Sequence, residues 1–318
     1  MITSIPIQFE GCFSDIMKTF IQYKRSLGLQ YDRPEYDLVR FSRFLVENNV
    51  TDLCITQEIA EKWCCKRESE SNKCWTNRIS IYNQFAVYLN SVGYSAYILP
   101  KPKNRYNEYV PHIFTEEEIN RIYYAADTIN AKRLNSYQRI MPVLVRLLFS
   151  TGLRISEAIN LKCSDIDFTT GILYLYDCKN GEDRIVPMHQ TLLEYLKEYA
   201  NEYIHDNEYF FETIHHTQIT AATCYKKFRD ILFSAGIPHG GRGKGPRLHD
   251  TRHSFAVHSL RHMINQGMDI YVSLPYLSVY LGHKSIVATE NYIRLTAEAY
   301  PELAALVNQY TGHVIPEV

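Results

Sequence analysis

The sequence lacks the features that would mark a membrane, secreted or nucleotide-driven protein. Its uninterrupted apolar runs are far shorter than the roughly 20 residues that a membrane span requires. Residues 1–9 have no basic stretch followed by an apolar block, so they do not resemble a secretory signal. No P-loop pattern of glycines and lysine is present either. We therefore expect a cytoplasmic protein that uses no nucleotide cofactor.

Cysteine forms no disulfide or zinc pattern in this chain. No two cysteines are spaced as C-x-x-C, and two of the eight are adjacent. They are Cys12, Cys54, Cys64, Cys65, Cys74, Cys163, Cys178 and Cys224. Because there is no export signal, we expect reduced thiols that pack as small apolar side chains.

An overall excess of positive charge is also absent, because the formal net charge is -1 at pH 7. The charges are unevenly distributed, however. Residues 1–105 carry more lysine and arginine than aspartate and glutamate, and Asp250 is the single acidic residue among several basic ones in 239–262. Phosphate contact needs a basic face rather than a basic protein, so nucleic-acid binding remains open.

What the sequence does contain indicates a globular protein of two domains. Hydrophobic residues make up 46% and charged residues 22%, and 318 residues suffice for two domains of ordinary size. In residues 8–95 apolar side chains recur every three or four positions, as in Phe13, Ile16 and Phe20, with no strand-like alternation. This pattern predicts a domain of four or five helices within 1–105.

Residues 99–112 predict a basic linker after this domain. Prolines at 100, 102 and 111 bar a continuous helix, and lysine and arginine lie between them. We expect a domain boundary near 105–112 and a second domain over 113–318.

The second domain is expected to be mostly helical with a small sheet. Thr115 and Glu118 form a capping-box pattern that opens a helix, and Gly152 ends a later apolar helix. Strands are expected at 172–176 and 184–186, joined by an Asn-Gly turn. The fold class is therefore mainly α: a helical first domain, then an α+β domain with a small antiparallel sheet of about three strands.

Two short patterns near this sheet contain candidate chemical groups. In TGLRISEAINL, Arg154 follows the helix-ending glycine and Glu157 lies in the next helical turn. A surface ion pair is the alternative for these two residues. In CKNG, Lys179 enters the hairpin turn, where a solvated lysine would also be ordinary. Neither pattern alone indicates a function.

The third pattern is RLHDTRHSFAVHSLRH. His249 and Arg252 are three residues apart, so both side chains project from one face of a helical turn. A zinc site is an alternative, because two pairs of histidines are four apart. These pairs are His249 with His253 and His258 with His262. Against zinc, the glutamate of the H-E-x-x-H motif is absent and Asp250 takes its place.

The fourth pattern is LGHKSIVATENYI. Gly282 suits the end of a helix, His283 lies in the turn, and a new helix is expected from about Ser285. Tyr292 and Leu295 share a stripe of that helix. Tyr292 could therefore be a core residue, as one of 25 tyrosines in the chain.

Together the four patterns supply groups that can handle a phosphodiester without a metal. Guanidinium groups grip phosphate oxygens, a tyrosine hydroxyl can attack phosphorus, and histidine and lysine can transfer protons. In this order they resemble the catalytic signature of tyrosine recombinases, the phage-integrase and Xer-type site-specific recombinases. The resemblance covers about 112–295 in full. Over the first domain it is limited to length, helical character and linker position.

The resemblance implies a role for each residue. Tyr292 would be the nucleophile, forming a 3′-phosphotyrosine bond with DNA and releasing a 5′-hydroxyl. Arg154 and Arg252 would clamp the scissile phosphate. His249 would be the acid/base partner of the tyrosine, and Lys179 would protonate the leaving oxygen. Two further members are His283, an additional phosphate donor, and Glu157, an accessory residue that braces the site.

The resemblance also implies partners. Both domains would close around double-stranded DNA, with Arg242, Lys244 and Arg247 as candidate phosphate contacts. The amphipathic segment after Tyr292 would dock on a neighbouring protomer, giving a homotetramer on DNA, or else pack on its own chain. The alternatives are a type IB topoisomerase-like nicking-closing enzyme and a catalytically silent DNA-binding relative.

Overall fold

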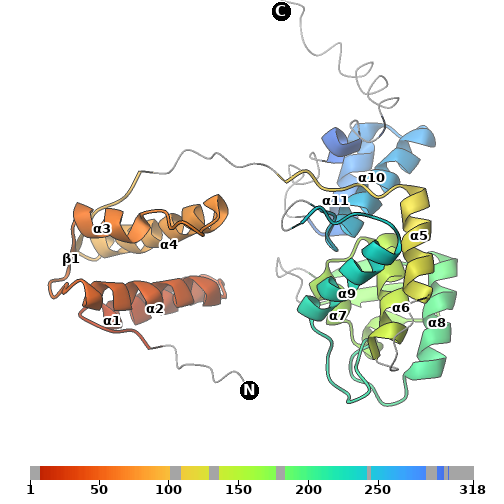
Figure 1. The fold of residues 1–318 in the computed structure, drawn as a ribbon, viewed down its shortest axis with the longest axis horizontal. Helices are drawn as coiled ribbons and strands as arrows, with labels where there is room; N and C mark the ends of the chain where they lie inside the picture. The colour runs from red at the N-terminus through yellow and green to blue at the C-terminus, as the bar shows by residue number, and fades with distance from the viewer. Residues whose placement is uncertain are drawn as a thin grey trace, which may run out of the picture. The chain divides into compact units, whose positions relative to one another are not determined.

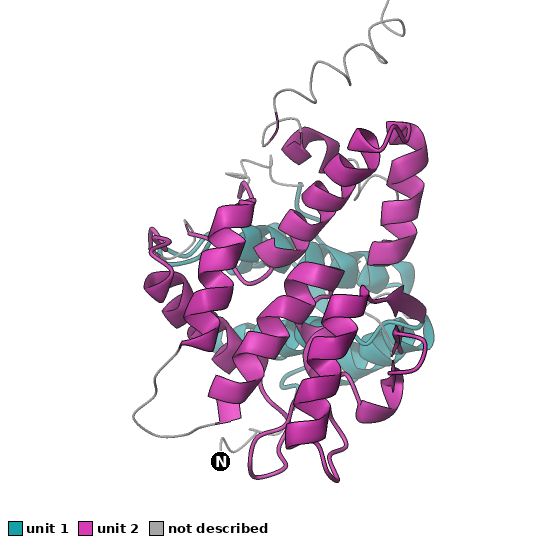
Figure 2. Cartoon of the chain, turned by 90° about the vertical axis from the view of Figure 1, so that its right-hand side faces the viewer, with its two compact units in different colours: residues 1–108 teal, residues 109–318 magenta. Residues whose placement is uncertain are grey.

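The computed structural model describes residues 8–100, 109–128, 136–176, 183–241, 245–283, 292–296 and 300. The chain divides into two compact units, Met1–Glu108 (unit 1) and Tyr109–Val318 (unit 2), which Figure 2 colours separately. No helix in the described part of the chain is long and apolar enough to cross a membrane.

Unit 1 is built from helices that share one aromatic core. The helices are α1 Ser14–Ser26, α2 Asp32–Glu47, α3 Gln57–Cys64 and α4 Asn72–Ser91 (Figure 1). Helix α4 contacts the other three, and Phe20, Phe41 and Phe85 are fully buried where they meet. The apolar periodicity in the sequence produces these amphipathic helices, because only one face of each can be buried.

One feature of unit 1 differs from the prediction of helices throughout. Strands β1 Cys54–Ile55 and β2 Ser95–Ala96 pair in parallel. With two residues each, they are too short to produce a visible alternation in the sequence. The side chain of Asn90 stabilises the pair, since it donates to the carbonyl of Ala96 and accepts from its backbone N–H.

Unit 2 combines helices with a three-stranded antiparallel sheet in the order β3-β4-β5, which confirms the predicted fold class. The elements before and within the sheet are α5 Glu116–Asp127, α6 Ser136–Thr151, α7 Ile155–Ile159, a 3-10 turn Cys163–Asp165, β3 Ile166–Asp167, β4 Ile172–Leu175 and β5 Arg184–Pro187. Those after it are α8 Gln190–Tyr203, α9 Ala221–Ser234, α10 Asp250–Asn265 and α11 Ile270–Leu281.

Helix α6 is central to unit 2, where it contacts α5, α7, α8, α9 and α10 (Figure 1). Its apolar residues Leu144, Leu147 and Leu148 are almost fully buried. Because α6 is held on so many sides, the turn that follows its last residue has a fixed position in the unit. That turn carries the first of the candidate site residues.

The predicted helix ends in unit 2 are confirmed. Glu118 donates its backbone N–H to the Thr115 hydroxyl at 3.2 Å, and the Glu118 carboxylate accepts the Thr115 backbone N–H at 3.0 Å. Gly152 and Gly282 end their helices in the left-handed region, with φ of 61° and 66°. The predicted Asn-Gly turn at 180–181, the helix start near Ser285 and the segment beyond Tyr300 lie outside the described residues.

Candidate active site

Three helix ends meet around the side chain of Arg252. Its Nη1 donates to the carbonyl of Gly152 at 2.8 Å, just past α6, and its Nη2 donates to the carbonyl of Leu281 at 2.6 Å, at the end of α11. Arg252 itself lies in the first turn of α10. Carbonyls at helix C-termini have no partner within the helix and carry partial negative charge, so they suit a guanidinium.

Arg252 is a buried cation, with only 2% of its surface exposed. Burial, followed by the positive charge of Arg154, lowers its pKa to about 10. Its hydrogen-bond partners in the described structure are two carbonyls and the imidazole of His283. No carboxylate of the described residues contacts this guanidinium, so an incoming anion would stabilise it.

Arg154 reaches the same place from the start of α7. Its Nη1 donates to Glu157 Oε1 at 2.7 Å, and its backbone N–H donates to Glu157 Oε2 at 2.8 Å. Its Nη2 lies 3.4 Å from the carbonyl of Gly282, the residue before His283. Arg154 is thus held by Glu157 on one edge while its other edge faces the turn that Arg252 also contacts.

Arg184, the first residue of β5, is a site residue that the sequence motifs do not predict. Its Nη1 and Nη2 donate to Oε1 and Oε2 of Glu157 at 2.9 and 2.8 Å. Burial would raise the pKa of Glu157, but the hydrogen bonds and charge of Arg184, together with Arg154, bring it to about 2. The sequence does contain an indication that Arg184 points inward. Arg184 shares a strand face with Val186, which is fully buried.

Tyr292 is both a core residue and a neighbour of the arginines. It is 4% exposed and packs in a cluster with Val257, Leu260 and Leu295. Burial raises the pKa of its hydroxyl, whereas the charge and hydrogen bond of Arg252 lower it, as does the charge of Arg154. The net effect is a raised pKa. Tyr292 is therefore a packed core residue whose hydroxyl is also within the electrostatic influence of both arginines, so the core interpretation and the chemical one are compatible.

Histidines surround the ring of Tyr292. The ring of His283 lies nearly parallel to it, with centroids 6.0 Å apart, and the ring of His253 lies at 5.7 Å. Burial, then neighbouring positive groups, lower the pKa of both imidazoles to about 4. Because a guanidinium only donates, Nε2 of His283 accepts from Arg252 Nη2 at 3.1 Å.

His249 lies at the start of α10, exposed, with its ring centroid 5.0 Å from that of His253. The structure thus gathers five of the predicted site residues directly and places His249 beside them. The five are Arg154, Glu157, Arg252, His283 and Tyr292. Lys179 lies outside the described residues.

Of the three candidate DNA contacts, Arg242 and Lys244 also lie outside the described residues. Arg247 is exposed, and its guanidinium carbon stacks 3.5 Å from the ring centroid of Tyr109. The Tyr109 hydroxyl donates to the buried carboxylate of Asp250, which also accepts the backbone N–H of Arg247. This network fixes the segment that leads into α10.

The described histidines of α10 bear on the zinc alternative. Among the described residues, no three His, Cys, Asp or Glu side chains are grouped so that they could hold a metal ion. Nε2 of His258 donates to the carbonyl of Phe114 at 2.8 Å, and its Nδ1 lies 3.0 Å from the hydroxyl of Tyr300. Both ring nitrogens of His258 are therefore already engaged.

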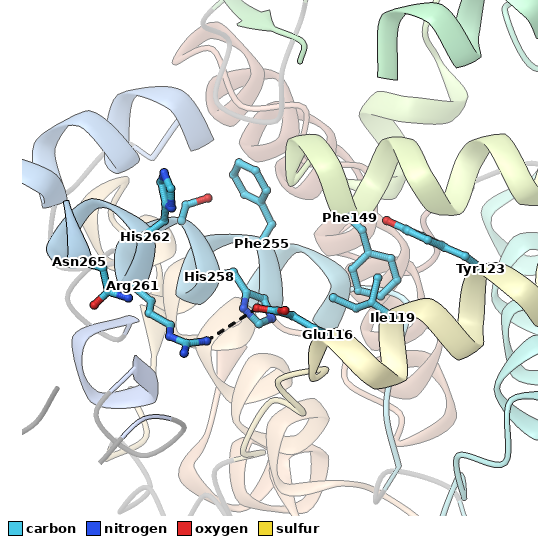
Figure 3. A pocket seen from close by; sticks show the side chains of 10 residues that line it. Glu116, Ile119, Tyr123, Phe149, Phe255, His258, Arg261, His262 and Asn265 are labelled. Carbon is cyan, nitrogen blue, oxygen red and sulfur yellow. Dashed lines mark ion pairs between the residues drawn. The ribbon is translucent and has the colours of Figure 1, made fainter. Parts of the chain in front are cut away.

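A hollow of about 490 Å³ lies elsewhere in unit 2, between α5, α6 and α10. Figure 3 shows Tyr123 and Phe149 at one end of it, and Arg261 paired with Glu116 at 3.8 Å. None of the gathered site residues lines this hollow. The candidate active site is instead the cluster around Arg252.

Comparison with known proteins identifies the family of the chain. The phage integrase family profile matches residues 112–299, more than half of the sequence. The chain belongs to the phage integrase family. This confirms the resemblance to tyrosine recombinases that the four motifs carry, and it places the matched region over the whole candidate active site.

Relatives of this phage integrase family member extend over most of the chain. A putative integrase/recombinase of Sinorhizobium fredii, y4rB, is 28% identical over 304 residues, 91% of this chain and 95% of the relative. The tyrosine recombinase XerA of Pyrococcus furiosus is 31% identical over 202 residues, 63% of each chain. XerC of Staphylococcus saprophyticus is 27% identical and covers 82% of this chain and 85% of the relative.

Solved structures share the fold. The XerH site-specific recombinase bound to a palindromic substrate has a TM-score of 0.64 at 21% identity, covering 94% of this chain and 86% of that one. A lambda integrase dimer bound to a core site has a TM-score of 0.61 at 18% identity, covering 87% and 76%. The likeness spans both units, so the fold of unit 1 also has counterparts among these proteins.

Proposed function

We propose that this tyrosine recombinase is a site-specific recombinase that cleaves and rejoins DNA through a 3′-phosphotyrosine at Tyr292, with no metal or nucleotide cofactor. The observation that carries the proposal is the position of Tyr292, whose ring lies 6.0 Å from that of His283, the imidazole that accepts from the buried guanidinium of Arg252. A nucleophile near a cation that has no carboxylate partner among the described residues is suited to an anionic substrate.

In the proposed reaction, the phosphate enters between the two arginines. Arg252 and the edge of Arg154 that faces the turn at Gly282 donate to the non-bridging oxygens and stabilise the charge of the transition state. The Tyr292 hydroxyl attacks phosphorus, with His249 taking its proton. The bond from phosphorus to the 5′ oxygen breaks, and Lys179 protonates that oxygen.

His283 gains its role once the phosphate has entered. In the free protein its Nε2 accepts from Arg252, and its pKa near 4 keeps it neutral at pH 7. When Arg252 turns toward the phosphate, Nε2 can carry the proton and donate to a phosphate oxygen instead. A neutral donor of this kind adds a hydrogen bond without adding another charge to a crowded cationic site.

The second half of the reaction reverses the first. A 5′-hydroxyl attacks the phosphotyrosine and gives its proton back to Lys179, a new phosphodiester forms, and Tyr292 leaves with the proton returned by His249. One phosphoester is exchanged for another at each step, so no nucleotide is consumed. Recombination differs from nicking and closing only in which 5′-hydroxyl performs this attack.

The proposal assigns DNA contacts to both units. Unit 1 and unit 2 would both bind double-stranded DNA. In support, the similar XerH structure is bound to its palindromic difH substrate and the lambda integrase dimer to a core site. We further propose a homotetramer on DNA, assembled through the segment after Tyr292. Binding of this kind depends strongly on salt, because phosphate contacts release counterions.

The test is covalent capture of DNA. The protein is incubated with a pool of nicked duplexes of randomised sequence, and complexes that survive denaturation are recovered and sequenced. Wild-type protein should yield a covalent band whose released strand ends in a 5′-hydroxyl. Tyr292→Phe, which removes one oxygen atom, should bind the same duplexes and yield no band.

Two other outcomes would redirect the proposal. Relaxation of supercoiled plasmid that lacks any recovered sequence would indicate a nicking-closing enzyme similar to topoisomerase IB. DNA binding with no covalent band from wild-type protein would indicate a catalytically silent relative, and the proposed function would be wrong.

A further inference from the structure

Glu157 accepts from two arginines, and this raises a question of charge. Arg154 is proposed to hold the scissile phosphate, yet its Nη1 is bound to the carboxylate of Glu157 at 2.7 Å. A carboxylate that close to a guanidinium cancels most of its attraction for an anion at longer range. With Glu157 alone, Arg154 would be well positioned but electrostatically weak.

Arg184 removes this conflict. It binds both oxygens of Glu157 in a fork at 2.9 and 2.8 Å, and its side chain is only 10% exposed. The Arg154–Glu157–Arg184 triad then has charges of +1, -1 and +1, which sum to +1. With Arg184 bound to it, Glu157 can orient Arg154 while the triad keeps a net positive charge for the phosphate.

Arg184 also links the sheet to the turn that carries His283. A Cβ placed on Gly282 would lie 3.0 Å from Arg184 Nη1 and 3.1 Å from Arg184 Cδ, so the guanidinium packs directly against the backbone there. Arg184 opens strand β5, and its partner in β4 is Leu175.

We propose that Arg184 is a positioning residue for strand cleavage. It acts through Glu157, setting the orientation and the effective charge of Arg154. It is not proposed to touch DNA. The inference rests on the proposed function, in which Arg154 binds the scissile phosphate.

The test compares Arg184→Gln with a matched variant, Arg146→Gln. Arg146 forms a similar fork on Asp127, at 2.8 and 2.6 Å, in the same unit and outside the candidate active site. The rate constant of covalent capture is measured on a duplex recovered with wild-type protein. Outer partners of reactive groups typically contribute on the order of 10- to 100-fold, as they do at metal sites. We expect a loss of that size for Arg184→Gln, unchanged DNA affinity, and no loss for Arg146→Gln.

Two further measurements separate positioning from other roles. A substrate with a neutral methylphosphonate at the scissile position needs less positive charge, so the loss in Arg184→Gln should shrink on it. In a Glu157→Gln background, Arg184→Gln should add little, because the route through Glu157 is already broken. Arg184→Lys, which keeps the charge and loses the fork, should fall between wild type and Arg184→Gln.

Each contrary result has a definite meaning. Equal losses in Arg184→Gln and Arg146→Gln, or equal losses on both substrates, would reduce Arg184 to a structural residue and overturn the inference. Additive losses in the double variant would mean that Arg184 acts directly on DNA, which also overturns it. In either case the covalent band of wild-type protein would still support the proposed function. Absence of that band would overturn both.

Discussion

Replacing Glu157 with glutamine should destabilise unit 2 by a predictable amount. The side chain is 6% exposed and accepts hydrogen bonds from two guanidinium groups and from the backbone N–H of Arg154. At about 1.4 kcal/mol per pKa unit, a fall from 4.5 to about 2 corresponds to about 3 kcal/mol. Removing one partner of a buried ion pair costs about 3–5 kcal/mol in general, in agreement with this value.

The assay is urea denaturation at pH 7 followed by two signals. Both tryptophans, Trp63 and Trp75, lie in unit 1, so their fluorescence follows that unit, whereas far-ultraviolet circular dichroism follows both. Glu157→Gln should move the circular-dichroism transition to lower urea and leave the fluorescence transition in place. Asp127→Asn is the control, because that carboxylate is 43% exposed and a surface ion pair contributes only about 0–1 kcal/mol.

The sign of the pH dependence gives a second check on the same residue. The pKa of Glu157 is lower in the folded protein than in the unfolded chain, so its stabilising contribution is present above pH 4.5 and lost as the pH falls through 2. The variant should lack this part of the acid transition. A destabilisation below about 1 kcal/mol, or an unchanged acid transition, would refute the argument that Glu157 holds two arginines in place.

Three further predictions follow from the geometry. Because the pKa of His253 and of His283 is near 4 in the folded protein and 6.5 ordinarily, stability should fall as the pH drops from 6.5 toward 4, and glutamine at either position should reduce that slope in thermal melts. Gly152→Ala should cost about 1–3 kcal/mol in urea denaturation, since φ is 61° and the added Cβ would lie 2.5 Å from the ring of Phe255; a change under 0.5 kcal/mol would contradict this. Fluorescence anisotropy on random-sequence duplex DNA should show affinity that falls steeply with salt, equally in wild type and Tyr292→Phe.

Local signals in the sequence were sufficient for much of the fold and for most of the candidate active site. Features that depend on neighbouring residues have patterns that are visible in a single sequence. They include the helix cap at Thr115, the left-handed glycines at 152 and 282, and the strands at 172–175 and 184–187. The site residues were found in the same way, through motifs that each lie within one short segment.

Contacts between distant segments were not visible in this way. The fork of Arg184 on Glu157 joins residues 27 apart, and the hydrogen bonds of Arg252 span 100 and 29 residues. Strand alternation could have shown that Arg184 points inward, but not which carboxylate it meets. The β1–β2 pair was not predicted for a related reason. Each of these two-residue strands forms only because it pairs with a partner about 40 residues away.

The most direct test of the account is to map the residue that carries the DNA. The covalent complex is digested with nuclease and trypsin, and the nucleotide-bearing peptide is sequenced by mass spectrometry. Our account predicts that the nucleotide is attached to Tyr292, in the tryptic peptide from Ser285 to Arg294, which contains one tyrosine. Attachment to any of the other 24 of the 25 tyrosines, or to a serine or histidine, would contradict it.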